Sequence, residues 1–267
     1  MPELPEVETV ARQLAPLVAG RVIRGVQIHD PKLRQVARER LTGGTIESVR
    51  RIGKQVVLQL RQGRGVRRWL VIHLRMTGRL IWRAAPARCE RSHLRLRLRL
   101  DGGSLCFYDL RRFGTVQVLD RPDGAATAGL DPTSPAFTAR ALEELLRGGR
   151  GQLKPWLLRQ DRLVGLGNIY CSEILFEAGL APHRAVGTLT DEEVARLHRT
   201  TRAVLRRAIR HCGTTFSDFQ DAQGLTGSYQ RYLKVYGREG QPCPRCCGPV
   251  RREQQQRSTF FCPRCQR

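Results

Sequence analysis

Acidic residues and long apolar runs are the two features that this sequence has little of. Asp and Glu together number 24 against 47 Lys and Arg, which leaves a formal net charge of +23 at pH 7. A positive surplus of this size repels itself unless a polyanion is the working partner, so nucleic acid is the favoured ligand. A membrane surface fits less well, because the basic residues are spread over the chain rather than gathered on one amphipathic helix.

The sequence also lacks the marks of export. No apolar run approaches the length that spans a bilayer, and the first ten residues carry three glutamates where a signal peptide has an apolar centre. The nine cysteines are an odd number in a long chain, which argues against a secreted disulfide scaffold. We therefore expect a reducing, cytoplasmic location. Four cysteines are expected to be buried small hydrophobic side chains rather than reactive thiols: Cys89, Cys106, Cys171 and Cys212.

The amino terminus carries a candidate nucleophile. Removal of Met1 would leave Pro2 as a free secondary amine, and an α-amino group with a pKa of about 7.7 to 8.0 is partly unprotonated at neutral pH. Such an amine can attack a sugar's anomeric carbon and form an iminium. Glu3 and Glu6 lie close enough to give and take protons. The competing interpretation is structural, since prolines and acidic residues are also common at helix starts.

Four of the remaining cysteines predict a metal site. Cys243 and Cys246 form one C-x-x-C pair, Cys262 and Cys265 form a second, and fifteen residues separate the pairs. This spacing is typical of one structural Zn²⁺ held by four thiolates in a closed tetrahedral site. Cys247 follows the second ligand directly, and it either competes as a ligand or lies exposed.

Periodicity predicts an α+β protein of several domains. Apolar residues at spacings of three and four predict an amphipathic helix from Glu3 to about Val18. Residues 21–120 read as seven or eight strands of a β-sandwich, and the alternating segment Leu94 to Leu100 has its arginines on an expected solvated face. Helices are predicted from Ala139 to Leu146, Ile169 to Ala178 and Thr190 to Gly213, followed by a long loop over residues 214–230. The expected divisions are residues 1–121 for the β-sandwich with its helix, 122–135 for a linker, 136–236 for the helical domain and 237–267 for the zinc finger.

Four motifs together resemble one enzyme family. The amino-terminal Pro-Glu-Leu-Pro-Glu, the segment Arg111 to Gly114, the segment Gly167 to Tyr170 and the four-cysteine cluster occur in the order found in the formamidopyrimidine-DNA glycosylase and endonuclease VIII family. The resemblance runs from Pro2 to Gln266. It implies a bacterial, monomeric enzyme that binds double-stranded DNA through a helix–two-turns–helix module and a zinc finger. The implied activity is a bifunctional DNA glycosylase and abasic-site lyase that excises oxidised purines, with 8-oxoguanine and formamidopyrimidines as substrates and β,δ-elimination as the strand cleavage.

The resemblance also implies a role for single residues. Pro2 would form the Schiff base with the sugar, and Glu3 would protonate the leaving base or the ring oxygen. The lysine and the arginine that the family places against phosphates around the lesion correspond to Lys54 and Arg257, which complete the catalytic set. The residues expected to contact DNA are Glu6, Met76, His93, Arg111, Phe113, Lys154 and Asn168.

The residues expected to contact DNA have different implied roles. Met76, Arg111 and Phe113 match residues that fill the gap left by an extruded nucleotide. Asn168 opens a helix after a Gly-flanked turn, where backbone N–H groups and a side-chain amide suit a phosphate. The competing interpretation is an ordinary helix N-cap, and the two are compatible. Leu110 stands where the family usually has proline, which puts the rigidity of that loop in question.

Two rival functions stay open at the level of sequence. An endonuclease VIII-like glycosylase acting on oxidised pyrimidines would share most motifs, although Leu4 occupies a position where that branch more often has glycine. A non-catalytic nucleic-acid-binding protein would need only the basic helices and the zinc finger. In that case Met76 and Phe113 would be ordinary core residues, and Lys54 and Arg257 solvated charges.

Overall fold

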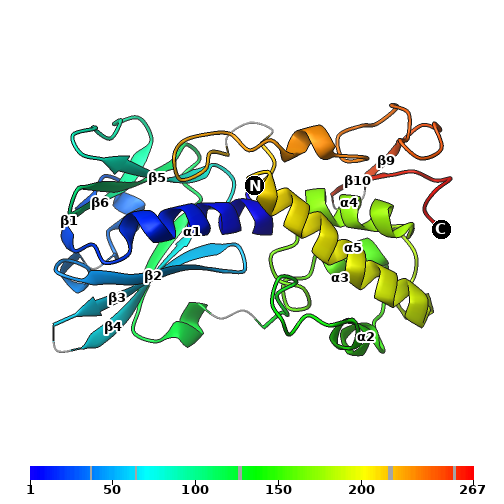
Figure 1. The fold of residues 1–267 in the computed structure, drawn as a ribbon, viewed down its shortest axis with the longest axis horizontal. Coiled ribbons are helices and arrows are strands. Elements are labelled where there is room, and N and C mark those ends of the chain that lie inside the picture. Colours follow the sequence, from blue (N-terminus) through cyan, green and yellow to red (C-terminus); the bar gives the residue numbers. More distant parts are fainter. Residues whose placement is uncertain (37, 64, 126–127, 216–218, 255–256) are drawn as a thin grey trace. The chain divides into compact units, whose positions relative to one another are not determined.

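The computed structural model describes residues 1–36, 38–63, 65–125, 128–215, 219–254 and 257–267. The chain forms two compact units (Figure 1). The first contains Met1–Ala126 and a later segment, His211–Gln230, and the second contains Thr127–Arg210 and Arg231–Arg267. Residues 126–127 of the expected linker and 216–218 of the expected loop lie outside the described residues.

The first unit is built on helix α1, Leu4–Val18. Its apolar stripe, which includes Leu4, Val7, Val10 and Leu14, is fully buried, because residues at this spacing share one helix face. The helix packs against β2, β3 and β5, so it contacts strands of both sheets (Figure 1). The predicted amino-terminal helix is confirmed within one residue at each end.

Two four-stranded antiparallel sheets complete the first unit. One has the order β1-β6-β7-β5 and the other β2-β3-β4-β8. Their bounds are Ile23–Ile28 for β1, Thr45–Ile52 for β2, Gln55–Gln62 for β3, Val66–His73 for β4, Gly78–Ala84 for β5, Leu94–Leu100 for β6, Gly103–Asp109 for β7 and Thr115–Leu119 for β8. Buried side chains of both sheets and α1 form one hydrophobic core. The expected β-sandwich with its helix is therefore confirmed, while β5 was missed, since no strand was predicted between Leu74 and Leu94.

One arginine of β6 contradicts the expected solvated face. Arg95 is 2% exposed, whereas Arg97 is half-buried and Arg99 exposed. The pairing of β6 with β7 shifts register between Leu94 and Leu96, and such a bulge turns the extra residue out of the alternation. The guanidinium of Arg95 is thereby directed into the interior, where two carboxylates neutralise it.

The expectation for two cysteines was also incomplete. Cys106 on β7 is buried as predicted, but its sulfur is bonded to that of Cys89 in a disulfide. The two residues are 17 positions apart, and the loop that precedes β6 brings them together. Spacing alone did not reveal this pair, because only the fold determines which cysteines become neighbours.

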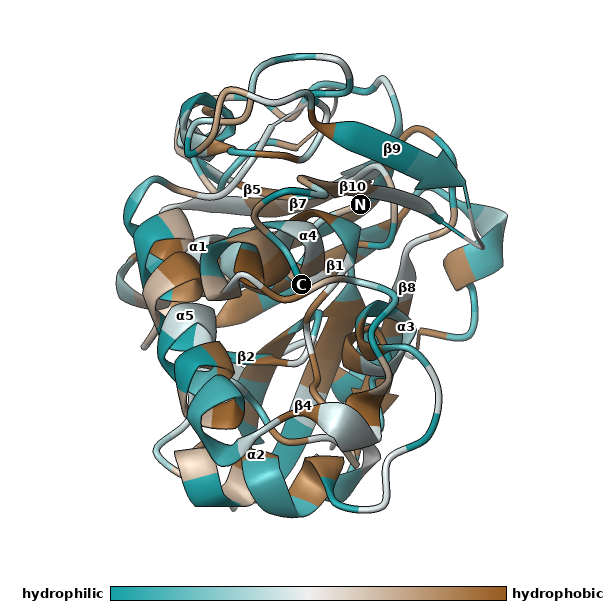
Figure 2. Cartoon of the chain, turned by 90° about the vertical axis from the view of Figure 1, so that its right-hand side faces the viewer, coloured by the Kyte–Doolittle hydropathy of each residue, from teal (hydrophilic) through white to brown (hydrophobic). Residues whose placement is uncertain are grey.

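The second unit contains four helices and a hairpin among its described residues. They are α2 (Ala139–Leu146), α3 (Leu153–Leu157), α4 (Asn168–Ala178), α5 (Asp191–Arg210), β9 (Arg251–Gln254) and β10 (Ser258–Phe261). Helix α4 is buried on nearly all sides and packs against α3, α5 and β10. Helix α5 is amphipathic, and Figure 2 shows β9 as largely hydrophilic, in agreement with the exposure of its four residues.

The helix ends follow from local chemistry. At the start of α5, Thr190 and Glu193 form the predicted capping box, with the Thr190 N–H donating to the Glu193 carboxylate at 2.9 Å. Gly179 ends α4 with a φ of 68°, a left-handed conformation that glycine adopts at little cost. Helix α3 was not predicted because it has only five residues. None of the described helices is long and apolar enough to cross a membrane.

Candidate active site and nucleic-acid interface

The start of α1 is held in place by two glutamates. Glu3 is the N-cap, and its N–H donates to Oε2 of Glu6 at 2.8 Å, while the Glu3 side chain accepts from the backbone of Glu6. The other oxygen of Glu6, Oε1, accepts from the N–H of Thr214 at 2.7 Å. Pro2 is buried beside them, and Met1 is exposed. Glu6 thus ties the amino terminus to the later segment of the same unit.

The contact with Thr214 depends on a glycine. Gly213 has a φ of 77°, and a Cβ at this position would lie 2.7 Å from Oε1 of Glu6. Any other residue would strain the backbone and collide with the carboxylate. The segment is held further by Gln13, whose amide donates to Asp221 at 2.9 Å and accepts from the N–H of Ala222 at 3.0 Å. The segment His211–Gln230 is therefore bonded to α1 at two places, Glu6 and Gln13.

Lys54 lies in the tight turn between β2 and β3. Gly53 supplies the left-handed conformation of this turn with a φ of 59°. Arg51 on β2 is nearly buried, and its Nε donates to Oε2 of Glu8 at 2.7 Å, so the Lys54 turn is tethered to the amino-terminal half of α1.

His73, at the end of β4, is kept neutral. Burial lowers the pKa of its imidazole to about 4, and the charges of Arg75 and Lys54 act in the same direction. Its Nδ1 accepts the N–H of Arg75 at 3.0 Å, which an imidazolium could not do. This bond stabilises a loop in which Arg75 has a φ of 54°.

Two loops of the first unit present exposed apolar side chains. Met76 is 41% exposed on the loop between β4 and β5, and Phe113 is 50% exposed on the loop between β7 and β8. The guanidinium of Arg111 lies 4.8 Å from the centre of the Phe113 ring. The loops are joined, because the hydroxyl of Thr77 donates to Asp109 and accepts the N–H of Arg111 at 3.1 Å. Met76 and Phe113 are therefore surface residues and not members of the core.

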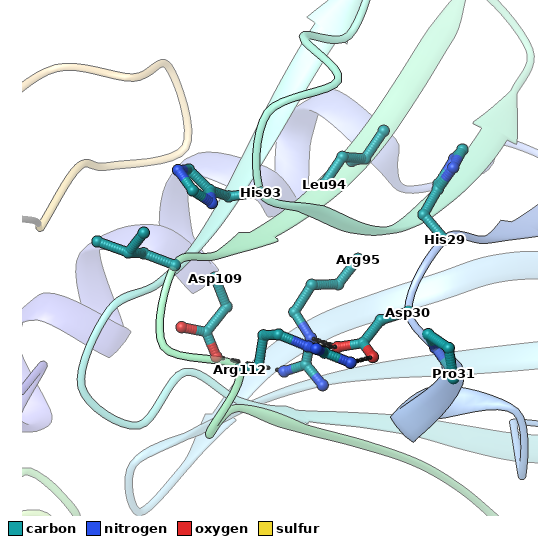
Figure 3. A pocket seen from close by; sticks show the side chains of 9 residues that line it. His29, Asp30, Pro31, His93, Leu94, Arg95, Asp109 and Arg112 are labelled. Carbon is teal, nitrogen blue, oxygen red and sulfur yellow. Dashed lines mark hydrogen bonds and ion pairs between the residues drawn. The ribbon is translucent and has the colours of Figure 1, made fainter.

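A pocket of about 200 Å³ lies behind the second of these loops (Figure 3). Its lining includes His93, which is exposed, and the buried carboxylate of Asp30. Hydrogen bonds from Arg112 hold the pKa of Asp30 well below its usual range, with help from Arg95. Sequence inspection missed Asp30 and Arg95 because neither belongs to a recognisable motif.

In the second unit, two of the expected DNA-binding residues converge on the zinc-finger hairpin. Lys154 is 2% exposed, and its Nζ donates to the carbonyl of Ser258 and the hydroxyl of Thr259, each at 3.0 Å. The amide of Asn168 donates to the same carbonyl at 2.9 Å. Arg257, the residue before this carbonyl, is exposed. Asn168 is the first residue of α4 and Gly167 the N-cap, so the simple capping interpretation of Asn168 was wrong.

The four predicted metal ligands form one cluster. Their sulfurs all lie within 4.8 Å of one another, with Cys243 and Cys265 3.8 Å apart and Cys246 and Cys262 3.5 Å apart. Zn–S bonds of about 2.3 Å in a tetrahedron place sulfurs about 3.8 Å apart, so this donor set fits one zinc ion. Cys247 is exposed and outside the cluster. Its φ of 58° marks a turn position that glycine favours.

A buried acid of α4 binds the backbone of the segment that leads into the four-cysteine cluster. Glu173 is 1% exposed and accepts three backbone N–H groups, those of Lys234, Val235 and Tyr236, at 2.8 to 3.0 Å. These contacts satisfy the buried carboxylate. They also order the chain that enters the finger.

Comparison with known proteins agrees with this division of parts. Three family models match in order: the formamidopyrimidine-DNA glycosylase N-terminal domain over residues 1–116, the formamidopyrimidine-DNA glycosylase H2TH domain over residues 128–220, and a zinc finger found in FPG and IleRS over residues 240–267. Fold and site thus define a zinc-finger protein of the DNA glycosylase class. The chain belongs to the formamidopyrimidine-DNA glycosylase (Fpg, MutM) family.

Relatives and solved structures cover the full length. The formamidopyrimidine-DNA glycosylase of Symbiobacterium thermophilum is 43% identical, with 100% of this chain and 89% of the relative covered. The MutM (Fpg) crystal structure from Thermus thermophilus superposes with a TM-score of 0.87 at 40% identity, covering 99% of this chain and 98% of the other. The Lactococcus lactis Fpg in complex with DNA containing an abasic site superposes with a TM-score of 0.89 at 33% identity and covers 99% of each chain.

Proposed function

We propose that this protein is a bifunctional DNA glycosylase and abasic-site lyase of base excision repair. It removes oxidised purines, namely 8-oxoguanine and formamidopyrimidines, from double-stranded DNA. Full-length relatives are formamidopyrimidine-DNA glycosylases, and a second Lactococcus lactis Fpg complex, matched over 100% of both chains, contains DNA with a Fapy-dG lesion. We place the protein in the bacterial cytoplasm with the nucleoid, where such DNA is found.

The chemistry starts at the processed amino terminus. The lone pair of the Pro2 nitrogen forms a bond to the anomeric carbon, and the bond to the damaged base breaks as Glu3 supplies a proton to the leaving base or the ring oxygen. The bond between the anomeric carbon and the ring oxygen then breaks, the ring oxygen takes up a proton as the Pro2 nitrogen loses one, and a ring-opened iminium remains. Loss of a proton from the adjacent sugar carbon then expels the 3′ phosphate, and a second elimination expels the 5′ phosphate. Water finally hydrolyses the iminium and returns the free amine.

The observation that supports this proposal best is the anchoring of the amino terminus. Glu6 accepts one backbone N–H from Glu3 and one from Thr214, so the first residues are ordered from two sides. A nucleophile gains most from a fixed position, because positioning removes the entropic cost of the encounter. A protein that only bound DNA would not need an ordered amino terminus.

The other residue assignments are part of the same proposal. Lys54 and Arg257 bind phosphates around the lesion, and Asn168 binds the DNA backbone at the start of α4. Arg111, Phe113 and Met76 fill the space left by the extruded nucleotide, which matches the exposure of Phe113 and Met76. His93 contacts a phosphate and Lys154 contributes to lesion binding. Glu6 acts through the order that it imposes.

We also retain the four-part division as a proposal, with residues 1–121, 122–135, 136–236 and 237–267 as its parts. The segment His211–Gln230 groups with the first compact unit, so the third part would serve both units. We further propose that the protein acts as a monomer, with one Zn²⁺ held by the four-cysteine cluster.

A borohydride trapping experiment tests the proposed nucleophile. Protein with Met1 removed, incubated with a duplex containing 8-oxoguanine, is expected to give a covalent adduct that peptide mass analysis assigns to Pro2. Protein that retains Met1 has a tertiary amide at this nitrogen, so it is expected to bind the same duplex and trap none of it. Equal trapping by the blocked protein would move the chemistry to a lysine, with Lys54 and Lys154 as the first suspects.

The same assay separates the rival functions. Faster cleavage of duplexes with oxidised pyrimidines than with 8-oxoguanine or formamidopyrimidines would favour an endonuclease VIII-like enzyme. Tight binding without trapping or nicking, even after Met1 is removed, would favour a non-catalytic DNA-binding protein. The Glu3→Gln variant refines the result, since it is expected to bind normally while excision fails.

A further inference from the structure

The loop that carries Arg111 and Phe113 has no proline before Arg111, yet its backbone is tightly held. Leu110 stands at the position before Arg111, so no proline ring restricts the chain there. Arg112 has a φ of 57°, a left-handed conformation that is unfavourable for a residue with a side chain. Such a conformation persists only where surrounding contacts determine it.

Asp30 supplies the contact that holds this conformation. Its Oδ2 accepts from Nε of Arg112 at 3.0 Å and its Oδ1 accepts from Nη2 of the same guanidinium, which makes a two-point ion pair. The Asp30 side chain is 4% exposed, and that of Arg112 is 47% exposed. The N–H of Lys32 also donates to Oδ1 at 2.9 Å, so the carboxylate is itself fixed by its own chain.

A second arginine connects Asp30 to the base of the loop. Nε of Arg95 donates to Oδ2 of Asp30 at 2.6 Å, and its Nη1 donates to Asp109 at 3.2 Å (Figure 3). The same Nη1 donates to the carbonyl of Gly114 at 2.7 Å. Asp109 in turn accepts the N–H of Gly114 at 2.6 Å. Both ends of the loop are therefore bonded to one buried cluster.

The charges of the cluster cancel, and the cluster contacts the neighbouring loop. Two carboxylates and two guanidinium groups leave no net charge, which is the condition under which buried ions are tolerated. Through Asp109 and Thr77 the cluster also contacts the loop of Met76. A change at Asp30 is thus transmitted to two exposed apolar side chains that Asp30 does not touch.

We propose that Asp30 is a positioning residue for nucleotide extrusion, which fixes the loop of Arg111 and Phe113 through Arg112 and Arg95. This inference rests on the proposed function in assigning the two loops to the DNA. Inserting a side chain between stacked bases is unfavourable, and a loop that must first be ordered adds its own entropic cost to the insertion. The ion pairs with Asp30 are formed before DNA binds, so the entropy of ordering the loop is lost during folding and not during insertion.

Arg112→Gln is the main test, because it removes the two-point ion pair and leaves the buried pair of Arg95 and Asp30 intact. Arg24→Gln is the matched control, since Arg24 forms an exposed ion pair with Asp101 in the same unit and its loss removes the same charge. Unstacking is followed with 2-aminopurine placed opposite a stable abasic-site analogue, so the readout does not require catalysis. The rate of the fluorescence rise is expected to fall about tenfold in Arg112→Gln and to change less than about twofold in Arg24→Gln.

A second substrate distinguishes positioning from general damage to the fold. On a duplex whose opposite base is missing, the inserting side chains displace nothing, and Arg112→Gln is expected to bind and nick like the wild type. Asp30→Asn is expected to show the same substrate dependence, with a lower thermal stability because Arg95 loses its partner. Equal unstacking rates in wild type and Arg112→Gln, or equal losses on both duplexes, would overturn the inference. Failure of the wild type to nick any damaged duplex while it still unstacks the probe would count against the proposed function alone.

Discussion

The two units hold an exposed side chain in place by different means. In the first unit, Phe113 stands on a loop whose backbone is bonded to the buried ions of Asp30 and Asp109. In the second unit, Arg257 directly precedes β10, and Lys154 donates a hydrogen bond to the carbonyl of Ser258, the first residue of that strand. The same unit contains the four-cysteine cluster that is suited to zinc. Each unit thus keeps a surface group ordered without placing it in a hydrophobic core.

The difference follows from the size of the available core. The first unit has a large core shared by both sheets and α1, and it can therefore accommodate a buried ion cluster at its edge. The finger has only a small apolar cluster around Phe176 and Val235, so metal binding must supply much of its folding free energy. Loss of one member of the buried ion cluster leaves an uncompensated charge inside a core that is otherwise intact. Loss of one zinc ligand removes the metal on which the folding of the finger depends.

Loss of a zinc ligand is expected to have the largest effect. Cys262→Ser should release zinc and unfold the finger, because structural zinc contributes about 10 kcal/mol or more to the folding of such modules. Cys212→Ser, at a cysteine outside the cluster, should retain one zinc per chain. Metal analysis and DNA-binding measurements test both. Carefully purified wild type without zinc, or a Cys262→Ser variant that keeps it, would contradict the assignment.

Breaking the ion cluster is expected to have the next largest effect. Asp109→Ala removes a fully buried carboxylate and leaves Arg95 with one partner fewer, so the free energy of unfolding should fall by about 3–5 kcal/mol. Asp161→Ala, at an exposed ion pair, should leave it nearly unchanged. Urea unfolding measures both. Similar losses in the two variants would show that the cluster is no more important than a surface pair.

Removal of the hairpin's buried lysine is expected to act locally. Lys154→Met keeps the aliphatic stem but loses the two hydrogen bonds to Ser258 and Thr259, a cost of about 1–3 kcal/mol. Amide exchange in β10 should therefore accelerate while zinc content is unchanged. Lys32→Met, at an exposed lysine, is the control. Slower or equal exchange in β10 would remove Lys154 from the support of Arg257.

Acidification is expected to have the smallest effect, and it acts on the first unit. The pKa of His73 is lowered to about 4 in the fold against about 6.5 when unfolded, so its contribution to stability is present above pH 6.5 and is lost as the pH falls toward 4. Asp30 has a lowered pKa as well, and its contribution is lost only below its unfolded value of about 4. Between pH 7 and 5 the decline should therefore come from His73.

Thermal melting across this pH range tests the assignment. The melting temperature of wild type should fall more between pH 7 and 5 than that of His73→Gln, which cannot take up a proton at this position. Parallel curves for the two proteins would mean that other groups cause the decline. NMR titration of the His73 ring provides an independent check, with a midpoint near 4 expected.

Short-range patterns in the sequence were sufficient for the zinc ligands, the helix α1 and the capping box of α5. Each depends on residues a few positions apart, and the spacing that identifies them is also the geometry that forms them. The family motifs led to the proposals for Pro2, Arg111 and Asn168, because the order of such motifs along the chain is informative without any contact between them.

Long-range pairings were decided only by the tertiary structure. Arg95 looked like one of three equivalent outward arginines, and a bulge in β6 directs it to Asp30, 65 residues earlier in the chain. Cys89 joins Cys106, and Glu6 accepts from Thr214, 208 residues away, for the same reason. The alternation of residues along a strand predicts the face of a side chain only while the register is regular. A buried charge cannot be predicted from one residue, because it depends on a partner that only the fold brings near. The sequence by itself therefore determined the amino-terminal helix, the four zinc ligands and the family of this protein. Only the tertiary structure decided which distant charges, carbonyls and sulfurs come into contact.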